Sequence, residues 1–125
     1  MRARAPGFSL IELMVVMAII AALLTIALPR YRNSLEHARE VALESNLRTL
    51  RDSIDRHHED RGRFPESLQA LVEARYLKSI PVDPITESAQ TWVIVMETVD
   101  DDSVVVDVRS GARGSTAQGV AYADL

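Results

Sequence analysis

The sequence contains no cysteine, so no disulfide can stabilise its fold. It also has no nucleophile elbow, no zinc-ligand spacing and no glycine loop followed by a lysine that would cradle a phosphate, so nothing in it predicts an enzyme. Basic residues are in the minority, with 14 Lys and Arg against 18 Asp and Glu, which gives a formal net charge of −4. This balance argues against nucleic acid as a partner.

What the sequence does have is one long apolar run near its start. From Phe8 to Leu28 there are 21 residues, of which only Ser9, Glu12 and Thr25 are plainly polar. As a helix this run is ~31 Å long at ~1.5 Å per residue, which matches the hydrocarbon core of a bilayer. An ordinary secretory signal does not fit, because its apolar region is about 7–15 residues long and ends at a small-residue cleavage site.

Two features distinguish this run from a simple membrane anchor. A short basic segment with Arg2 and Arg4 precedes it and ends at Pro6-Gly7, and Glu12 places a carboxylate inside apolar sequence. A carboxylate buried alone in hydrocarbon would be costly or become protonated. We therefore expect Glu12 to have a partner; a tolerated polar residue near the membrane surface is the alternative.

The segment Gly7-Phe8-Ser9-Leu10-Ile11-Glu12-Leu13 resembles the class III signal of type IV pilins and type II secretion pseudopilins. The resemblance implies that a membrane aspartyl prepilin peptidase cuts between Gly7 and Phe8 and methylates the new amino terminus of Phe8. It also implies that Glu12 is the assembly glutamate, and that Pro29 is the proline at which the helix kinks. An ion pair between Glu12 and the Phe8 ammonium of a neighbouring subunit would offset desolvation only in the assembled state.

A second stretch, residues 71–84, is similar to the corresponding part of the major pseudopilins of type II secretion, the protein G group. In that group the C-terminal loop binds calcium through acidic side chains and backbone carbonyls. Here the comparable loop, residues 110–124, has Asp124 as its only acid, and Arg113 would repel a cation. We therefore expect neither a metal nor a cofactor, because calcium prefers several oxygen ligands that usually include carboxylates.

The pattern beyond the apolar run predicts an α+β fold, and the resemblance implies a lollipop shape. We expect one long helix from Phe8 to Arg61, a short helix after Pro65, and antiparallel strands over residues 91–97 and 103–109, with the turn between their cores held within residues 97–102. Residues 110–119 are expected to form a flexible loop. The apolar positions of the long helix beyond the membrane form two stripes, one at Tyr31, Leu35, Ala38 and Ala42, and one at Leu43, Leu47, Leu50, Ile54 and His57.

Proline removes one helical hydrogen bond, so Pro29 predicts a kink or local melting. We expect the helix to stay continuous in the isolated chain and to loosen over residues 24–30 in a filament.

Two polar clusters suggest metal sites. Adjacent residues on a helix point in different directions, and His57 and His58 are not four residues apart, so a solvated helix end is the better interpretation of this pair. The acidic run at residues 100–102 is either a cation site or a hairpin tip, and the tip is favoured because aspartate supports turns.

The predicted organisation is a leader over residues 1–7, a transmembrane or filament-core half-helix over 8–29, and a periplasmic globular domain over 30–125 that includes the second half of the helix. The resemblance implies a non-enzymatic subunit that crosses the bacterial inner membrane once and self-associates into a helical filament, the type II secretion pseudopilus. Its implied partners are the prepilin peptidase, a cytoplasmic ATPase, a membrane platform protein and minor pseudopilins.

Two alternatives remain open. A type IV pilin displayed outside the cell would share the same N-terminal chemistry, although many such pilins close a C-terminal loop with a disulfide that this sequence cannot form. A monomeric membrane-anchored binding module would tolerate Glu12→Leu, whereas a filament subunit would not.

Overall fold

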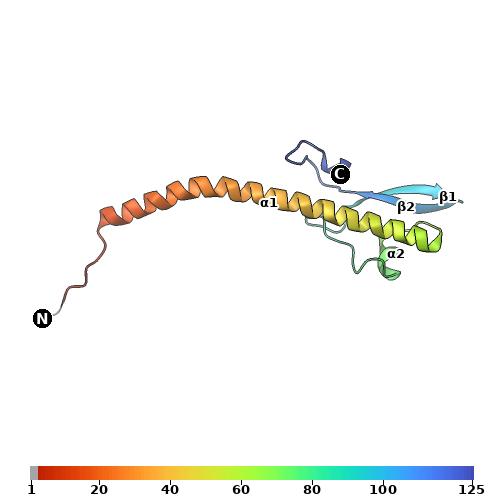
Figure 1. Ribbon diagram of the computed structural model, residues 1–125, viewed down its shortest axis with the longest axis horizontal. Coiled ribbons are helices and arrows are strands. Elements are labelled where there is room, and N and C mark those ends of the chain that lie inside the picture. The colour runs from red at the N-terminus through yellow and green to blue at the C-terminus, as the bar shows by residue number, and fades with distance from the viewer. Residues whose placement is uncertain (1–2) are drawn as a thin grey trace. The chain divides into compact units, whose positions relative to one another are not determined.

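The computed structural model describes residues 3–125 and has the α+β composition that the sequence predicts (Figure 1). Met1 and Arg2, at the start of the expected leader, lie outside the described residues. The described chain divides into two compact units, one ending at Glu36 and the other comprising His37–Leu125. The elements are the helices α1 (Leu10–Arg61) and α2 (Leu68–Glu73), the strands β1 (Val93–Val99) and β2 (Asp102–Arg109), and the C-terminal 3-10 turn η1 (Tyr122–Asp124).

The long helix is confirmed, although it begins two residues later than predicted. Its end at Arg61 follows from Gly62, which has φ +68° and donates its N–H to the carbonyl of His58 at 2.8 Å. A positive φ is readily adopted only by glycine, so this residue terminates the helix at no steric cost. The helix continues through Pro29, as expected for the isolated chain.

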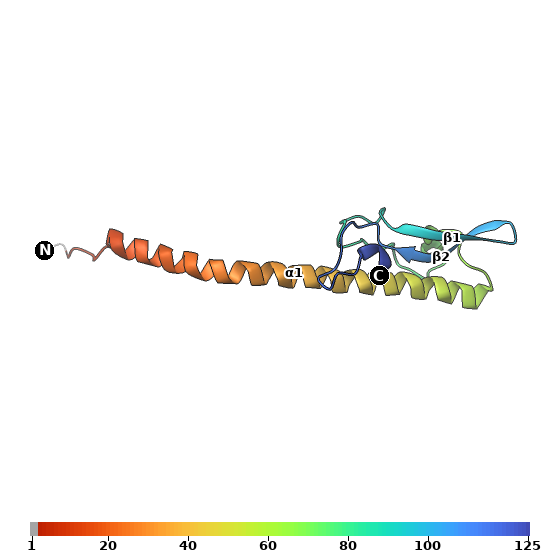
Figure 2. The ribbon, with the colours of Figure 1, turned by 90° about the horizontal axis from the view of Figure 1, so that it is seen from above.

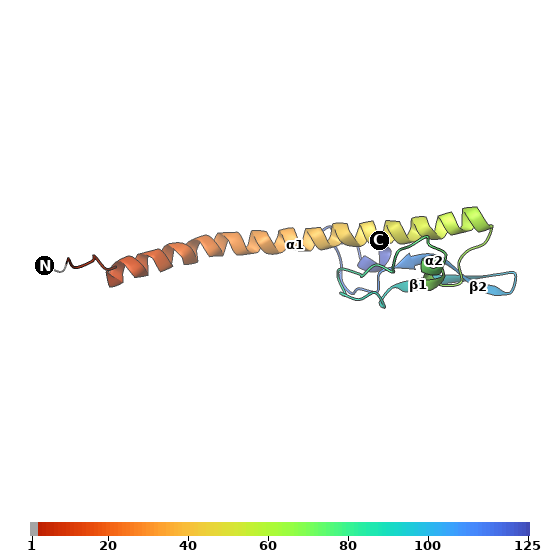
Figure 3. The same ribbon diagram turned by 90° about the horizontal axis from the view of Figure 1, so that it is seen from below.

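The second apolar stripe of α1 forms the core of the C-terminal unit. In Figures 2 and 3 the hairpin, α2 and the C-terminal segment lie on one side of the second half of α1. The helix residues buried on that side are Glu40, Leu43, Leu47, Leu50, Ser53, Ile54 and His57. The other stripe, from Tyr31 to Ala42, remains exposed in the single chain.

The second helix, α2, is six residues long and ends before Tyr76. Ser67 caps it, because its Oγ accepts the N–H of Ala70 at 3.1 Å. Arg75 adopts φ +66°, so the chain leaves the helix before Tyr76, which instead packs at the edge of the core.

The two strands form the predicted antiparallel hairpin, and its turn lies inside residues 97–102, as expected. Val99 pairs with Asp102, so only Asp100 and Asp101 form the turn, with φ values of +52° and +70°. A two-residue turn with both residues at positive φ matches the twist of a hairpin, and aspartate tolerates that conformation better than most residues. The acidic run is therefore a hairpin tip.

A β-bulge interrupts the register of the hairpin. Val95 pairs with Asp107 and Met96 pairs with Val105, which leaves Val106 as an extra residue on β2. Val105, directly before this residue, and Val108, two positions after it, are both fully buried.

His57 corrects the prediction of a solvated helix end. It is only 4% exposed, and its Nδ1 lies 2.9 Å from the carbonyl oxygen of Arg63. Its ring and that of Tyr76 pack in a T-shaped arrangement with centroids 5.4 Å apart. His57 thus belongs to the core and fixes the start of the loop after α1, whereas His58 stays exposed and stacks on Phe64.

Residues 110–119 form a loop, as predicted, and internal hydrogen bonds close it. Ser115 and Ala121 form a β-bridge, and the N–H of Thr116 donates to the carbonyl of Val120 at 2.8 Å. Gly111 lies close to Thr91, which precedes β1. A Cβ added to Gly111 would lie 2.0 Å from the carbonyl oxygen of Thr91. Only glycine fits there.

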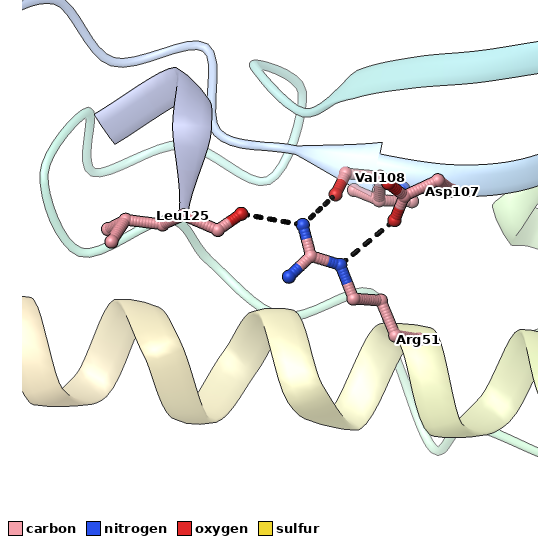
Figure 4. Close-up of polar contacts among 4 residues, drawn as sticks. All are labelled: Arg51, Asp107, Val108 and Leu125. Atoms are coloured by element: carbon pink, nitrogen blue, oxygen red, sulfur yellow. Dashed lines mark hydrogen bonds and ion pairs between the residues drawn. The ribbon is translucent and has the colours of Figure 1, made fainter. Parts of the chain in front are cut away.

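Arg51 ties α1 to both β2 and the C-terminal residue (Figure 4). Its Nε donates to Oδ1 of Asp107 at 2.9 Å, and its Nη2 donates to the carbonyl oxygens of Val108 at 2.9 Å and Leu125 at 2.7 Å. The planar guanidinium suits this arrangement, because its donors have a fixed fork geometry.

Candidate processing and assembly site

The predicted cleavage site lies in an accessible segment before α1. Residues 3–9 belong to no helix or strand and are all exposed. An added Cβ on Gly7 would meet no atom within 4 Å, and Phe8 is 87% exposed. The Gly7–Phe8 peptide bond is therefore open to an enzyme that binds the chain in extended form.

Ser9 and Glu12 form a capping box at the start of α1. The Oγ of Ser9 accepts the N–H of Glu12 at 3.1 Å, and Oε2 of Glu12 accepts the N–H of Ser9 at 3.4 Å. The N–H of Leu13 also donates to the carbonyl of Ser9 at 3.2 Å. The reciprocal pair satisfies two backbone donors that the first helical turn would otherwise leave free.

The Glu12 carboxylate thus has a local partner in the single chain, but the contact is exposed and the backbone donor carries no net charge. Because the longer of the two bonds is the one that involves the carboxylate, the box leaves Glu12 able to bind a stronger donor.

The first half of α1 has the length and hydropathy of a membrane span. Its most apolar 18-residue window has a mean hydropathy of 2.7, and no part of that window is buried within the chain. Thr25 lowers its own polarity by donating its hydroxyl to the carbonyl of Ala21 at 2.8 Å. The segment therefore presents an apolar surface that must be covered by lipid or by other chains.

The predicted site residues do not form one constellation. Gly7, Phe8 and Glu12 share one short segment, whereas Pro29 lies inside α1, more than four helical turns further along the chain.

Sequence reasoning missed the role of Ser9, although a serine three residues before a glutamate is a capping-box signal. It also missed Glu40, which is 7% exposed and accepts the N–H of Ala117 at 2.9 Å. No local pattern predicts that contact, because its two residues lie 77 positions apart.

Comparison with known proteins places this N-terminal segment in a family. Residues 2–28 match the model of the prokaryotic N-terminal methylation motif. No solved structure matches the chain significantly.

Curated relatives extend the similarity beyond the motif. The chain is 33% identical over 72 residues to the competence protein ComGC of Halalkalibacterium halodurans, covering 58% of this chain and 71% of that protein. It is 31% identical over 97 residues to the type II secretion system core protein G of Klebsiella pneumoniae, covering 65% and 69%. It is also 27% identical over 115 residues to the fimbrial protein EcpC of Eikenella corrodens, covering 88% and 70%. The motif, the membrane-length helix and these relatives agree: the chain belongs to the type IV pilin-like pseudopilin family.

Proposed function

We propose that the chain is a structural subunit of a type II secretion pseudopilus. A prepilin peptidase cuts between Gly7 and Phe8 and methylates the amino group of Phe8. The observation that carries this proposal is the exposed Gly7–Phe8 bond directly before a capped, membrane-length helix, within residues that match the N-terminal methylation motif.

Glu12 drives assembly in this proposal. Cleavage creates an ammonium on Phe8, and a neighbouring subunit staggered along the filament axis presents its Glu12 carboxylate to that ammonium. The charge-assisted bond replaces the weak contact between Glu12 and the N–H of Ser9. A buried ammonium left without this partner would cost about 3–5 kcal/mol, so misregistered subunits are disfavoured.

The membrane supplies the platform for assembly. The apolar half of α1 holds each subunit in the inner membrane with the leader in the cytoplasm and the C-terminal unit in the periplasm. A cytoplasmic ATPase and a membrane platform protein then add subunits, and minor pseudopilins join the same filament. The exposed apolar surface of α1 supports this proposal, because it requires partners outside the chain.

Three variants of Glu12 test the proposal. Glu12→Gln retains the capping box, since glutamine also serves at this position, but it removes the charge. Glu12→Asp keeps the charge with a shorter reach, and Glu12→Ala removes both. We expect insertion and cleavage in all three, no filaments from the Ala and Gln variants, and partial assembly from Asp. Normal filaments from Glu12→Gln at equal membrane levels would show that capping, rather than ion pairing, is the role of this residue.

A type IV pilin is the second candidate, and the similarity to a fimbrial protein over 88% of this chain favours it. The two functions separate in cells that express the gene at its native level. If the chain is a pseudopilin, unmodified cells carry no surface filaments that shearing could release, and deletion of the gene blocks protein secretion. A pilin deletion removes surface filaments and leaves secretion intact.

A further inference from the structure

The family resemblance implies calcium in the C-terminal segment, residues 110–124, but the residues present there do not fit it. The segment has one acidic side chain, Asp124, and one basic side chain, Arg113, so its side-chain charges cancel. Calcium takes six to eight oxygen ligands and relies on carboxylates among them. Across residues 3–125, no three His, Cys, Asp or Glu side chains come together as a possible metal site.

A carboxylate from outside the segment holds it instead. Glu40 on α1 is 7% exposed, and its Oε1 accepts the N–H of Ala117 at 2.9 Å. The hydroxyl of Thr116, the preceding residue, accepts the N–H of Val120 at 3.3 Å. The oxygens at the tip of the segment therefore already accept backbone N–H groups. A cation would have to displace these N–H groups in order to bind there.

A second carboxylate fixes the start of the segment in the same manner. Asp83 is fully buried, and its Oδ2 accepts the hydroxyl of Ser110 at 2.5 Å. Its Oδ1 accepts the N–H groups of Ile85 at 2.8 Å and Thr86 at 3.3 Å. Both oxygens of this carboxylate bind protein donors, so a metal would have to compete with them for its lone pairs.

Leu125, the residue directly after the segment, is fixed by a cation of the protein itself. The guanidinium of Arg51 donates to Leu125 at 2.7 Å while it also binds Asp107. The start of the segment, its tip and the residue that follows it each have an internal anchor, in Asp83, Glu40 and Arg51 respectively.

We propose that the C-terminal segment closes without calcium, and that the Glu40 carboxylate supplies the closure that a bound cation would otherwise provide. Glu40 lies on α1, which also carries the second apolar stripe that forms the core. Folding of the core and closure of the segment are therefore coupled. This inference concerns the C-terminal unit alone and does not depend on the proposed role in secretion.

The test uses the full chain in detergent micelles, with calcium chloride or with EDTA. Thermal unfolding by circular dichroism reports on stability, and amide hydrogen exchange at Ala117 reports on the closed tip. We expect the unfolding midpoint and the Ala117 exchange rate to be the same in both solutions. A midpoint raised by roughly 10 °C in calcium, the effect of a site held near a hundredfold above its dissociation constant, would overturn the proposal.

Variants of Glu40 identify the group that closes the segment. Glu40→Ala should speed exchange at Ala117 about tenfold, as expected for the loss of one hydrogen bond to a charged acceptor. Glu40→Gln should have a smaller effect, because its amide oxygen still accepts this N–H. Glu44→Ala, an exposed position one turn along α1, should leave the exchange rate unchanged.

Unchanged exchange in Glu40→Ala would contradict the proposal, and so would protection of Ala117 by calcium in either Glu40 variant. If Glu40→Ala does not fold, the comparison of calcium with EDTA in the unmodified chain and in Glu40→Gln still decides the outcome.

Discussion

Arg51 on α1 and Asp107 on β2 are joined by a 2.9 Å bond between Nε and Oδ1, although 56 positions separate them in the chain. Both side chains are about one-third exposed, so solvent screens part of the ion pair. Screening does not remove the geometric role of Arg51, because the same guanidinium also binds the carbonyl oxygens of Val108 and Leu125. Arg51 therefore acts as a fixed connection between three parts of the C-terminal unit.

Replacing Arg51 should release these parts together. Arg51→Lys keeps the charge but loses the fork, and we expect it to lower the free energy of unfolding by about 1–2 kcal/mol. Thermal unfolding measures this loss, with Arg48→Lys at an exposed site on the same helix as the control. Equal stability of the two variants would mean that a point charge suffices at position 51.

Gly7→Leu should block processing without disturbing the fold. A leucine side chain has space in the free chain, where nothing lies within 4 Å of an added Cβ, but we expect it to crowd the cleft of the peptidase. Mass spectrometry should find the uncleaved precursor in the membrane. Ala5→Leu, two residues earlier, should give a mature chain that begins with N-methylated Phe8. A mature chain that begins near Pro29 would instead refute the cleavage site.

Ser9→Ala complements the Glu12 variants, because it removes the cap and retains the charge. We expect the loss of the hydroxyl acceptor to destabilise the first turn of α1 by about 1 kcal/mol. Filament formation should nevertheless remain near normal, as counted by electron microscopy at equal protein levels. Filament loss as severe as in Glu12→Ala would indicate that the helix start itself controls assembly.

Pro29 should loosen α1 only in the filament. The proline supplies no N–H, yet the helix is continuous in the single chain. Neighbouring subunits in a filament can satisfy freed carbonyls between residues 24 and 30. A filament map at side-chain resolution checks this expectation, and unbroken helical hydrogen bonding from Thr25 to Pro29 would contradict it.

Gly111→Ala should destabilise the C-terminal unit by about 3 kcal/mol, the upper range for overpacking. The reason is that the added methyl group would lie 2.0 Å from a backbone oxygen, that of Thr91, and a backbone atom cannot rotate away. Arg113→Ala, at an exposed site in the same segment, is the matched control for a thermal unfolding measurement. Similar midpoints for the two variants would show that the segment shifts freely away from Thr91.

Periodic patterns in the sequence predicted the elements with strong local signals. The spacing of Leu43, Leu47, Leu50 and Ile54 identified the buried face of α1, and Gly62 identified its end. The runs of β-branched residues located both strands to within two residues.

The sequence patterns did not predict contacts that join distant residues. Glu40 and Arg51 resemble the solvated charges beside them on α1, and only their partners in the C-terminal segment distinguish them. His57 was misassigned for a related reason, because its polarity suggested solvent while its place on the apolar stripe indicated the core. The spacing was the better guide.

The extra residue in β2 determines which lengths of this strand are compatible with the core. In a regular strand, residues separated by an odd number of positions point to opposite faces, yet Val105 and Val108 are both fully buried. The bulge at Val106 reverses the parity of the strand between them. Deleting this one valine would leave Val105 and Val108 two positions apart in a regular strand, where both still face the core, whereas inserting one residue into that regular strand would turn one of them toward water. A two-residue deletion at the tip would leave the parity of the core positions unchanged.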